Sequence, residues 1–421
     1  MFRDSARGRP RRRFCLRLGV VALVVMTVTA ACGKSNSGSD GSADAPSGPK
    51  LSGEPVKVMT VTSLNSQGPV FPMIKTTAET YEKWINAHGG INGRPLQVIS
   101  CDDQGQPTQA SACARKAVEE KVVAAVGSYS FFADAIVPIL AAAKIPWFGT
   151  CCAGTPQELT NSVSFPIGSS LMYAVGFVQR AREDGCKMIK AVVIDGAQPY
   201  IEPMENAMKA YGMEFVEPPI ILPQTSQDDS PYVARATKDS DCIVMVVSET
   251  LWKPWFAAYK AAGAKQRMYG PQGNLDATSI KGFEDVAEGS VVAGSFPDLA
   301  TAPWKDYREA LKTYKAPDDQ DYNSLGGMGA WAGYTAFTQI ASKVTDLNAA
   351  SFLDAASKTT DLNLNGMVPP IDFTKPWTDG LKGYERLFSR SVSFRVVKDG
   401  QVQPLTTEPV DVTDLALGNA P

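Results

Sequence analysis

Six cysteines in the body of this chain could form disulfides or act as reactive thiols: Cys101, Cys113, Cys151, Cys152, Cys186 and Cys242. Six cysteines allow about 15 complete pairings, so their number alone fixes nothing. Cys101 ends a strand-like apolar run and Cys113 follows in a helical pattern, which favours a short bridged loop. Cys186 and Cys242 each precede an apolar strand pattern and would be neighbours if those strands are parallel. Cys151 and Cys152 then pair with each other or stay reduced, and both alternatives remain open.

His88 is the only histidine, which removes a Ser-His-Asp triad, a Cys-His pair and most zinc sites. The chain also lacks a Gly-rich phosphate loop ending in Lys-Ser or Lys-Thr. Asp318, Asp319 and Asp321 lack the spacing of a calcium-binding loop, so we expect them in a solvated loop. The glycines around Gly329 lie inside a helical pattern and indicate helix packing. We therefore expect a protein that is not an enzyme and uses no cofactor or metal.

Cys32 is the candidate for lipid attachment. An arginine-rich stretch precedes an uncharged apolar run over residues 18–31, which is typical of a secretory signal and short for a membrane-spanning helix. Cleavage after Ala31 would make Cys32 the first residue, as in bacterial lipoproteins. Export could use either the general or the twin-arginine route. Residues 32–55 are rich in Gly, Ser, Asp and Pro and are expected to be a flexible tether.

The charge balance excludes one class of partner. Seven arginines and one aspartate lie in residues 1–31, so the rest of the chain has 34 basic and 43 acidic side chains, a formal charge of −9. That balance speaks against nucleic acid as a partner. About 390 residues suffice for two domains with their own cores.

Alternating strand and helix patterns occur in two series, which predicts an α/β fold with parallel sheets. The first series has strands expected at residues 56–61, 96–101, 122–126 and 145–148. The second has strands expected at 189–194, 215–222, 242–247, 267–269 and 290–296. Helical patterns at 304–314 and 324–344 follow, and a hairpin is expected around Asp399 and Gly400.

Several motifs, in this order and at this spacing, resemble a known family. The motifs lie at residues 86–96, 102–103, 126–130, 155–160, 270–273 and 369–373. Together they resemble the branched-chain amino-acid (Leu/Ile/Val) binding proteins of ABC importers, and the resemblance covers nearly the whole chain after Cys32. It implies a type I periplasmic-binding fold, with two Rossmann-like lobes, a three-crossover hinge and a ligand cleft between the lobes.

The resemblance also implies a division of the chain and a set of ligand-binding residues. Residues 1–31 would be the signal peptide and 32–55 the tether, with 56–164 plus 297–368 as the first lobe and 165–296 plus 369–410 as the second. Ser130 and Thr155, with Ala153 beside it, match positions that bind a ligand carboxylate. Tyr200 matches a residue of the second lobe that closes over the ligand.

Departures from the family pattern concern the ligand. Where amino-acid binders carry a carboxylate for the ligand ammonium group, this chain has Gln272, and a neutral amide pairs poorly with a buried ammonium. The aromatic residue of the first loop is displaced, with Phe71 nearby. Cys152 could form an apolar wall of the cleft through a vicinal disulfide. The segment with Glu249, Thr250 and Trp252 ends a second-lobe strand, and Glu249 could replace the missing charge.

These features predict a lipid-anchored, extracytoplasmic solute-binding protein that passes its ligand to an ABC permease in the membrane. The departure at Gln272 favours a carboxylate or amide ligand without a free α-amino group. Branched-chain amino acids remain the alternative within the same role. A ligand sensor that signals to a membrane partner is the alternative from a different functional class.

Overall fold

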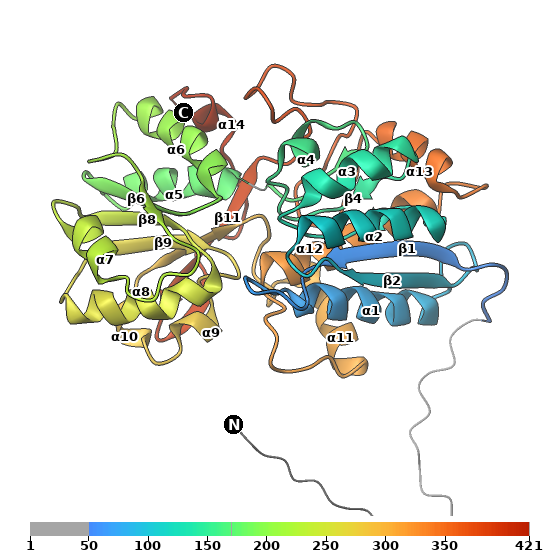
Figure 1. Cartoon of the computed structure of the whole chain (residues 1–421), viewed down its shortest axis with the longest axis horizontal. Coiled ribbons are helices and arrows are strands. Elements are labelled where there is room, and N and C mark those ends of the chain that lie inside the picture. The colour runs from blue at the N-terminus through green and yellow to red at the C-terminus, as the bar shows by residue number, and fades with distance from the viewer. Residues whose placement is uncertain (1–49, 170, 421) are drawn as a thin grey trace, which may run out of the picture. The chain divides into compact units, whose positions relative to one another are not determined.

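Two β-sheets, each covered by helices on both faces, form the body of the protein in a computed structural model that describes residues 50–169 and 171–420 (Figure 1). The predicted signal peptide, Cys32 and most of the tether lie outside these residues. No helix within the described part has the length and apolarity needed to cross a membrane. The described residues belong to one compact unit.

The first sheet is parallel and defines the first lobe. Its strands, in spatial order, are β2 (Leu96–Asp102), β1 (Val56–Thr62), β3 (Ala125–Val126), β4 (Trp147–Phe148) and β5 (Ser164–Phe165). Its helices are α1 (Pro72–Ala87), α2 (Pro107–Glu119), α3 (Ala133–Ala142), α4 (Pro156–Thr160), the 3-10 turn η2 (Ala302–Trp304), α11 (Lys305–Thr313), α12 (Leu325–Ala341) and α13 (Ala349–Ser357).

The second sheet defines the second lobe. Its strands run in the order β12 (Gln401–Pro404), β11 (Ser391–Lys398), β10 (Val291–Gly294), β9 (Arg267–Pro271), β8 (Cys242–Val246), β6 (Ile189–Ile194) and β7 (Ile220–Leu222), with β13 (Val410–Asp411) paired to β11. Strands β6 to β10 are parallel, and β11 returns antiparallel to β10. Its helices are α5 (Met172–Glu183), η1 (Gln198–Tyr200), α6 (Ile201–Ala210), α7 (Ser230–Thr237), α8 (Glu249–Ala261), α9 (Ala277–Ile280), α10 (Glu284–Ala287) and α14 (Thr413–Ala416).

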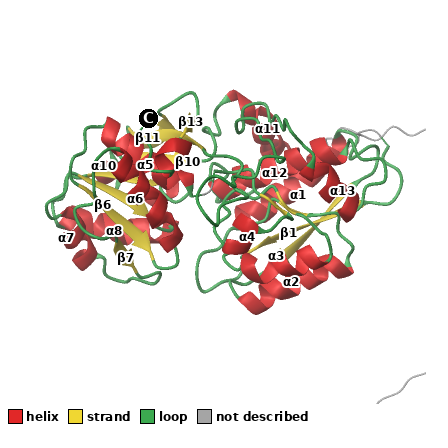
Figure 2. Ribbon diagram, turned by 90° about the horizontal axis from the view of Figure 1, so that it is seen from above, coloured by secondary structure: helices red, strands yellow, loops and turns green. Residues whose placement is uncertain are grey.

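Alternation along the strands places each apolar side chain in one of two cores. In β1, Val58 packs under the layer that holds α1, α11 and α12, whereas Met59 faces α2 and α3. In β8, Val244 faces α5 and α6, whereas Ile243 faces α7 and α8. Figure 1 shows α1 and α2 on opposite faces of β1 and β2, and Figure 2 shows the same covering of both sheets. The predicted class, an α/β fold with parallel-sheet cores in two lobes, is confirmed.

The chain passes between the two sheets three times, after β5, after β10 and before β11. The lobe boundaries differ from the predicted ones. Phe296 and Phe373 pack in the core of the first lobe, although they were assigned to the second. The second lobe continues beyond residue 410, because Leu415 of α14 packs against its core. Large apolar side chains decide these boundaries, since each must be buried in one core or the other.

Secondary structure departs from prediction mainly around prolines and uniformly apolar segments. The strand expected at 215–222 is only three residues long, since Pro218 and Pro219 just before it have no N–H to donate to a sheet. Helix α5 was not predicted, because most of its residues are buried and the usual one-sided apolar stripe is missing. Asp399 and Gly400 form the expected hairpin turn, both with positive φ.

Helix α12 lies against the carboxyl ends of the first-lobe strands. A Cβ on Gly149, which follows β4, would stand 2.6 Å from Cα of Gly333, so both positions need glycine for this close approach. The glycines of α12 therefore serve helix packing, as predicted.

Candidate functional site

Two adjoining cavities of about 180 and 230 Å³ lie between the first and second lobes. Both are lined from loops that follow the carboxyl ends of strands of the two sheets. Ligands of open α/β sheets bind at such strand ends. The residues common to both cavities are Pro69, Tyr129, Phe131, Cys152, Tyr173, Tyr200, Ser248 and Asn274.

The first-lobe wall is organised by Asp103, a buried carboxylate at the end of β2. It accepts hydrogen bonds from the hydroxyls of Ser63, over 2.6 Å, and Ser130. The Ser130 hydroxyl also accepts from the backbone N–H of Phe132 over 3.1 Å. Ser130 lines the smaller cavity as expected, but its hydroxyl proton is already donated to Asp103. It holds the loop after β3, which places Tyr129 at the cleft.

Thr155 also lines the smaller cavity, at the N-cap of α4. Its backbone N–H was expected to bind a ligand carboxylate, but it donates over 3.1 Å to Oε2 of Glu158. The Gly154 N–H donates to the same oxygen over 3.0 Å, and the Trp147 indole N–H donates to Oε1 over 2.9 Å. The Thr155 hydroxyl oxygen is buried and lies next to Glu158, with which Thr155 forms the capping box of α4. Neither polar hydrogen-bonding group of Thr155 is therefore exposed to the cavity.

Glu158 is therefore a structural carboxylate beneath the first-lobe wall, and it was not among the predicted site residues, although its spacing from Thr155 is that of a helix capping box. Burial raises the pKa of its carboxyl, opposed by the hydrogen bonds from Gly154, Trp147 and Thr155. It lines the smaller cavity, so its charge faces any ligand there.

Cys151 and Cys152 are joined in a vicinal disulfide, which is one of the two alternatives left open by the sequence. Cys152 lines both cavities, whereas Cys151 is buried against α12. A Cβ on Gly329 would stand 2.3 Å from Cβ of Cys151, so the glycine makes room for the disulfide. Cys152 supplies an apolar part of the cleft wall.

The second-lobe wall is aromatic. Tyr200, in the turn η1 after β6, lies beside Tyr173 with ring centroids 5.3 Å apart. The carbonyl of Pro199 accepts from the Tyr384 hydroxyl over 3.0 Å, which holds this turn in place. Burial raises the pKa of Tyr200 to about 12 and that of Tyr173 well above its ordinary value, so both phenols are neutral at physiological pH.

Aromatic side chains of the first lobe face the same space. Phe71 packs edge-on against Tyr129, with centroids 5.0 Å apart, and Phe131 packs beside both rings. Tyr129 and Phe131 line both cavities, and Phe71 lines the larger one. Burial raises the pKa of Tyr129 well above its ordinary value. Sequence reasoning identified Phe71 and Tyr200 but missed Tyr129, Phe131 and Tyr173.

Glu249 begins α8 and lines the larger cavity together with Thr250. Its carboxylate has no hydrogen bond or ion pair with any described residue. Burial, with a smaller contribution from Asp276, raises the pKa of Glu249 to about 7, and Lys253 opposes the shift. Glu249, which the sequence offered as a possible replacement for the missing charge, therefore lies at the cavity surface, and its ligand-binding role stays a prediction.

Gln272 lines the larger cavity, but its side chain is used within the protein. Its Nε2 donates to the Asn323 carbonyl over 3.0 Å, and its Oε1 accepts from the Phe296 N–H over 3.3 Å. The residue is 1% exposed. Gln272 therefore links the end of β9 to the segment before α12, a structural role that its sequence position did not reveal.

Two predicted site residues do not line the cavities. Ala153, in the first-lobe segment before α4, is buried against apolar side chains of the second lobe. Trp252 packs against β9, because a Cβ on Gly270 would stand 2.4 Å from its ring. Glu249 instead begins α8 at the cleft edge.

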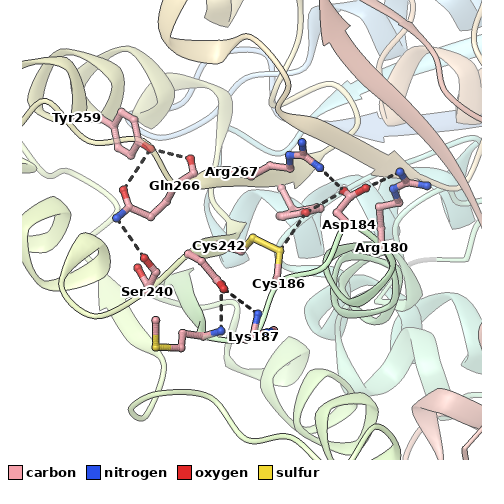
Figure 3. Close-up of a disulfide and its surroundings, with 12 residues drawn as sticks. Arg180, Asp184, Cys186, Lys187, Ser240, Cys242, Tyr259, Gln266 and Arg267 are labelled. Carbon is pink, nitrogen blue, oxygen red and sulfur yellow. Dashed lines mark hydrogen bonds and ion pairs between the residues drawn. A yellow bond between two sulfur atoms is a disulfide. The ribbon is translucent and has the colours of Figure 1, made fainter.

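The remaining disulfides join Cys101 to Cys113 and Cys186 to Cys242, as predicted. The second joins the segment just before β6 to the first residue of β8, at the strand ends opposite the cleft. Figure 3 shows it near Asp184, which forms ion pairs with Arg180 and Arg267. The backbone N–H of Lys187 donates to Asp241 over 2.8 Å. Asp241 lies beside both sulfurs. Because the two cysteines are bonded to each other, they offer no thiolate to a metal.

Asp321 differs from the solvated loop predicted for its segment. Burial raises its pKa well above the ordinary range, and the nearby Asp276 adds to the shift. One oxygen of each carboxyl group is buried without a partner. These groups lie outside the two cleft cavities, next to the buried Arg395.

Two lobes of this topology with a cleft at their strand ends define a binding protein of the periplasmic type. A family model for periplasmic binding proteins matches residues 57–382, and the chain belongs to that family. The family is one of binding proteins, which supports the prediction that the chain is not an enzyme. Among curated proteins, no sequence matches this chain.

Solved structures share the fold. A substrate-binding periplasmic protein from Ralstonia solanacearum is 18% identical, with a TM-score of 0.69 over 83% of this chain and 99% of that one. A fatty acid ABC transporter substrate-binding protein from Thermomonospora curvata is 17% identical, with a TM-score of 0.72 over 88% and 95%. A leucine binding protein from Thermotoga maritima is 15% identical, with a TM-score of 0.66 over 85% and 99%.

Proposed function

We propose that this chain is the extracytoplasmic, lipid-anchored solute-binding component of an ABC importer. The observation that carries the proposal is the cleft itself, which is lined from the strand ends of both lobes and includes aromatic side chains from each. The structural relatives from ABC transporters support the same role. Closure of the lobes would bury the ligand and present a surface to the membrane permease.

Membrane attachment would come from Cys32. The basic stretch, the apolar run and the small residues before Cys32 support cleavage and lipidation there. The tether that follows would keep the binding protein at high effective concentration near its permease. Labelling with a radioactive fatty acid should mark the wild-type chain, and Cys32→Ser should abolish the label and release the protein from membranes. A labelled Cys32→Ser variant would contradict this part of the proposal.

The hydrogen bonds of the cleft residues bear on which of the ligand classes considered from the sequence are compatible with the site. A carboxylate ligand is poorly supported, because the Ser130 hydroxyl proton and the Thr155 N–H are donated to the protein's own carboxylates. An amide carries no net charge for the carboxylates at the cleft to repel, so it remains compatible with this site. Branched-chain amino acids are also poorly supported, because Gln272 is engaged within the protein.

Ligand binding is tested by thermal shift with a broad panel of amino acids, amides, carboxylates, amines and neutral aromatic compounds. A solute-binding protein should be stabilised by at least one class, because ligand binds the folded state alone. Small-angle X-ray scattering should then show a smaller radius of gyration with that ligand. Stabilisation by none of the classes, or binding without closure, would contradict the proposed function.

A further inference from the structure

The charges that line the cleft are all of one sign. Glu158 and Asp195 line the smaller cavity and Glu249 lines the larger one. Among the described residues, neither cavity is lined by a lysine, an arginine or a histidine. A ligand that enters this space meets carboxylates from both lobes, and an anion would be repelled by them.

The hydrogen-bond donors on the first-lobe wall do not make the cleft more favourable for an anion. The Thr155 N–H serves Glu158, and the Ser130 hydroxyl serves Asp103. At these two positions the wall therefore lacks the pair of free donors that a carboxylate requires. An anionic group would be desolvated there without compensation.

Aromatic rings from both lobes form another part of the wall. Tyr129, Tyr173 and Tyr200 line both cavities, and Phe71 packs edge-on against Tyr129. The phenols come from both lobes, so closure would bring rings around a ligand from two sides. The face of an aromatic ring attracts a cation, and the attraction grows when water is excluded.

Glu249 supplies the countercharge. Its carboxylate enters the larger cavity from the second lobe and has no partner among the described residues. The charged groups that act on it are Asp276, which disfavours its ionised form, and Lys253, which favours it. An unpaired, half-buried carboxylate facing a ring of phenols is matched by a ligand with a positive charge.

We propose that the cleft takes an organic cation, an amine or quaternary ammonium compound without a carboxylate, held over the tyrosine faces and paired with Glu249. The inference rests on the proposed function and names the chemical class of its ligand. A neutral aromatic compound fits the rings but leaves Glu249 unpaired, so the two classes differ in the role of that carboxylate.

The experiment compares compounds of one shape and different charge by calorimetry on the purified protein. Choline is matched with 3,3-dimethylbutan-1-ol and 3,3-dimethylbutanoate, and phenethylamine with phenethyl alcohol and phenylacetate. At least one cation should bind about tenfold or more tightly than its neutral counterpart, and the anions should bind more weakly still. Equal or tighter binding of a neutral or anionic member overturns the inference and leaves the proposed function standing. Failure of both cations to bind, whatever else does, also overturns it.

Two sets of variants test the assigned residues. Glu249→Gln should weaken the cation about tenfold and change the neutral counterpart by less than about twofold. The exposed Glu214, outside the cleft on the second lobe, provides the matched control, and Glu214→Gln should change neither. Tyr200→Leu should weaken the cation about tenfold, whereas Tyr200→Phe keeps the ring and most of the affinity. Equal losses of cation and neutral ligand in Glu249→Gln would refute the pairing.

Discussion

The backbone N–H of Thr155 donates a hydrogen bond across 3.1 Å to Oε2 of Glu158, three residues further along the chain. The sequence suggested that this N–H would bind the carboxylate of a ligand. The carboxylate of Glu158 accepts this hydrogen bond from the inner side of the loop, so the N–H is not free for a ligand. Glu158 also places a buried negative charge at the cleft wall. The same short segment therefore shapes the loop and biases the site against anions.

Glu158→Gln should lower the free energy of unfolding by about 1–3 kcal/mol. A glutamine has one acceptor oxygen in place of two, so its NH₂ group would face either the Trp147 indole N–H or the N–H groups of Gly154 and Thr155. Urea unfolding measures the change, with the exposed Glu214→Gln as control. A variant as stable as the wild type would mean that Glu158 is not held by these donors.

The unliganded protein should become less stable as the pH rises from about 5 to about 8. Glu158, Glu249 and Asp276 have pKa values raised by burial, so the folded protein holds protons that the unfolded chain has already lost. Their contribution is complete below the ordinary carboxyl pKa and, for Glu249, disappears as the pH passes about 7. Urea unfolding at several pH values measures the slope.

Glu249→Gln should make the free energy of unfolding depend less steeply on pH. The full pKa shift of Glu249 would correspond to a change of about 3 kcal/mol in the free energy of unfolding. Because the group is half-buried, solvent screening reduces this change to about 1 kcal/mol. In the wild type, affinity for a cation should rise over the same pH range, because the carboxylate must ionise to pair with it. A cation affinity that is independent of pH would argue against ion pairing at Glu249.

The disulfide between Cys186 and Cys242 should contribute to the stability of the fold and not to ligand binding. Replacing Cys186 and Cys242 with alanine should lower the free energy of unfolding by about 4 kcal/mol, because the bond closes a loop of 56 residues. Ligand affinity should be unchanged, since this bond lies at the strand ends opposite the cleft. Calorimetric titration and urea unfolding of the same variant measure both quantities.

The vicinal pair should show the opposite pattern. Alanine at Cys151 and Cys152 should cost less stability, because the bond closes no chain loop of appreciable length. It should weaken ligand binding, because Cys152 lines both cavities. Mass spectrometry of the non-reduced protein should detect all three bonds. Undiminished ligand affinity without the vicinal pair would remove Cys152 from the site.

The sequence predicted the fold well, because buried parallel strands such as β1 and β8 are short apolar runs between amphipathic helices. It also placed Tyr200, Thr155 and Glu249 near the strand ends, where ligands of such sheets bind. The sequence could not reveal which hydrogen-bond donors of the site are already bonded to other groups of the protein. The hydrogen bond of Gln272 to Asn323 joins residues 51 positions apart, and only the packed structure brings them together.

Tyr129 and Tyr173 were missed for a related reason. Tyr173 lies in α5, which is buried on nearly all sides, so no apolar stripe indicated which face meets the cleft. Tyr129 was read as one of several polar residues after β3, and its orientation depends on the bonds that Ser130 makes to Asp103 and Phe132. Local pattern indicates where a loop lies, whereas the direction of its side chains depends on distant partners.

Gln272→Leu should distinguish a structural role from a ligand-binding one. The change should lower the free energy of unfolding by about 1–3 kcal/mol, because the carbonyl of Asn323 and the N–H of Phe296 lose their partner. The affinity of the variant for any ligand should fall by less than about threefold, because the side-chain amide of Gln272 forms its hydrogen bonds within the protein. The exposed Gln97 is the control, and Gln97→Ala should change stability by at most about 0.5 kcal/mol. A large loss of affinity at unchanged stability would instead place the Gln272 amide on the ligand and restore the role that its sequence position suggests.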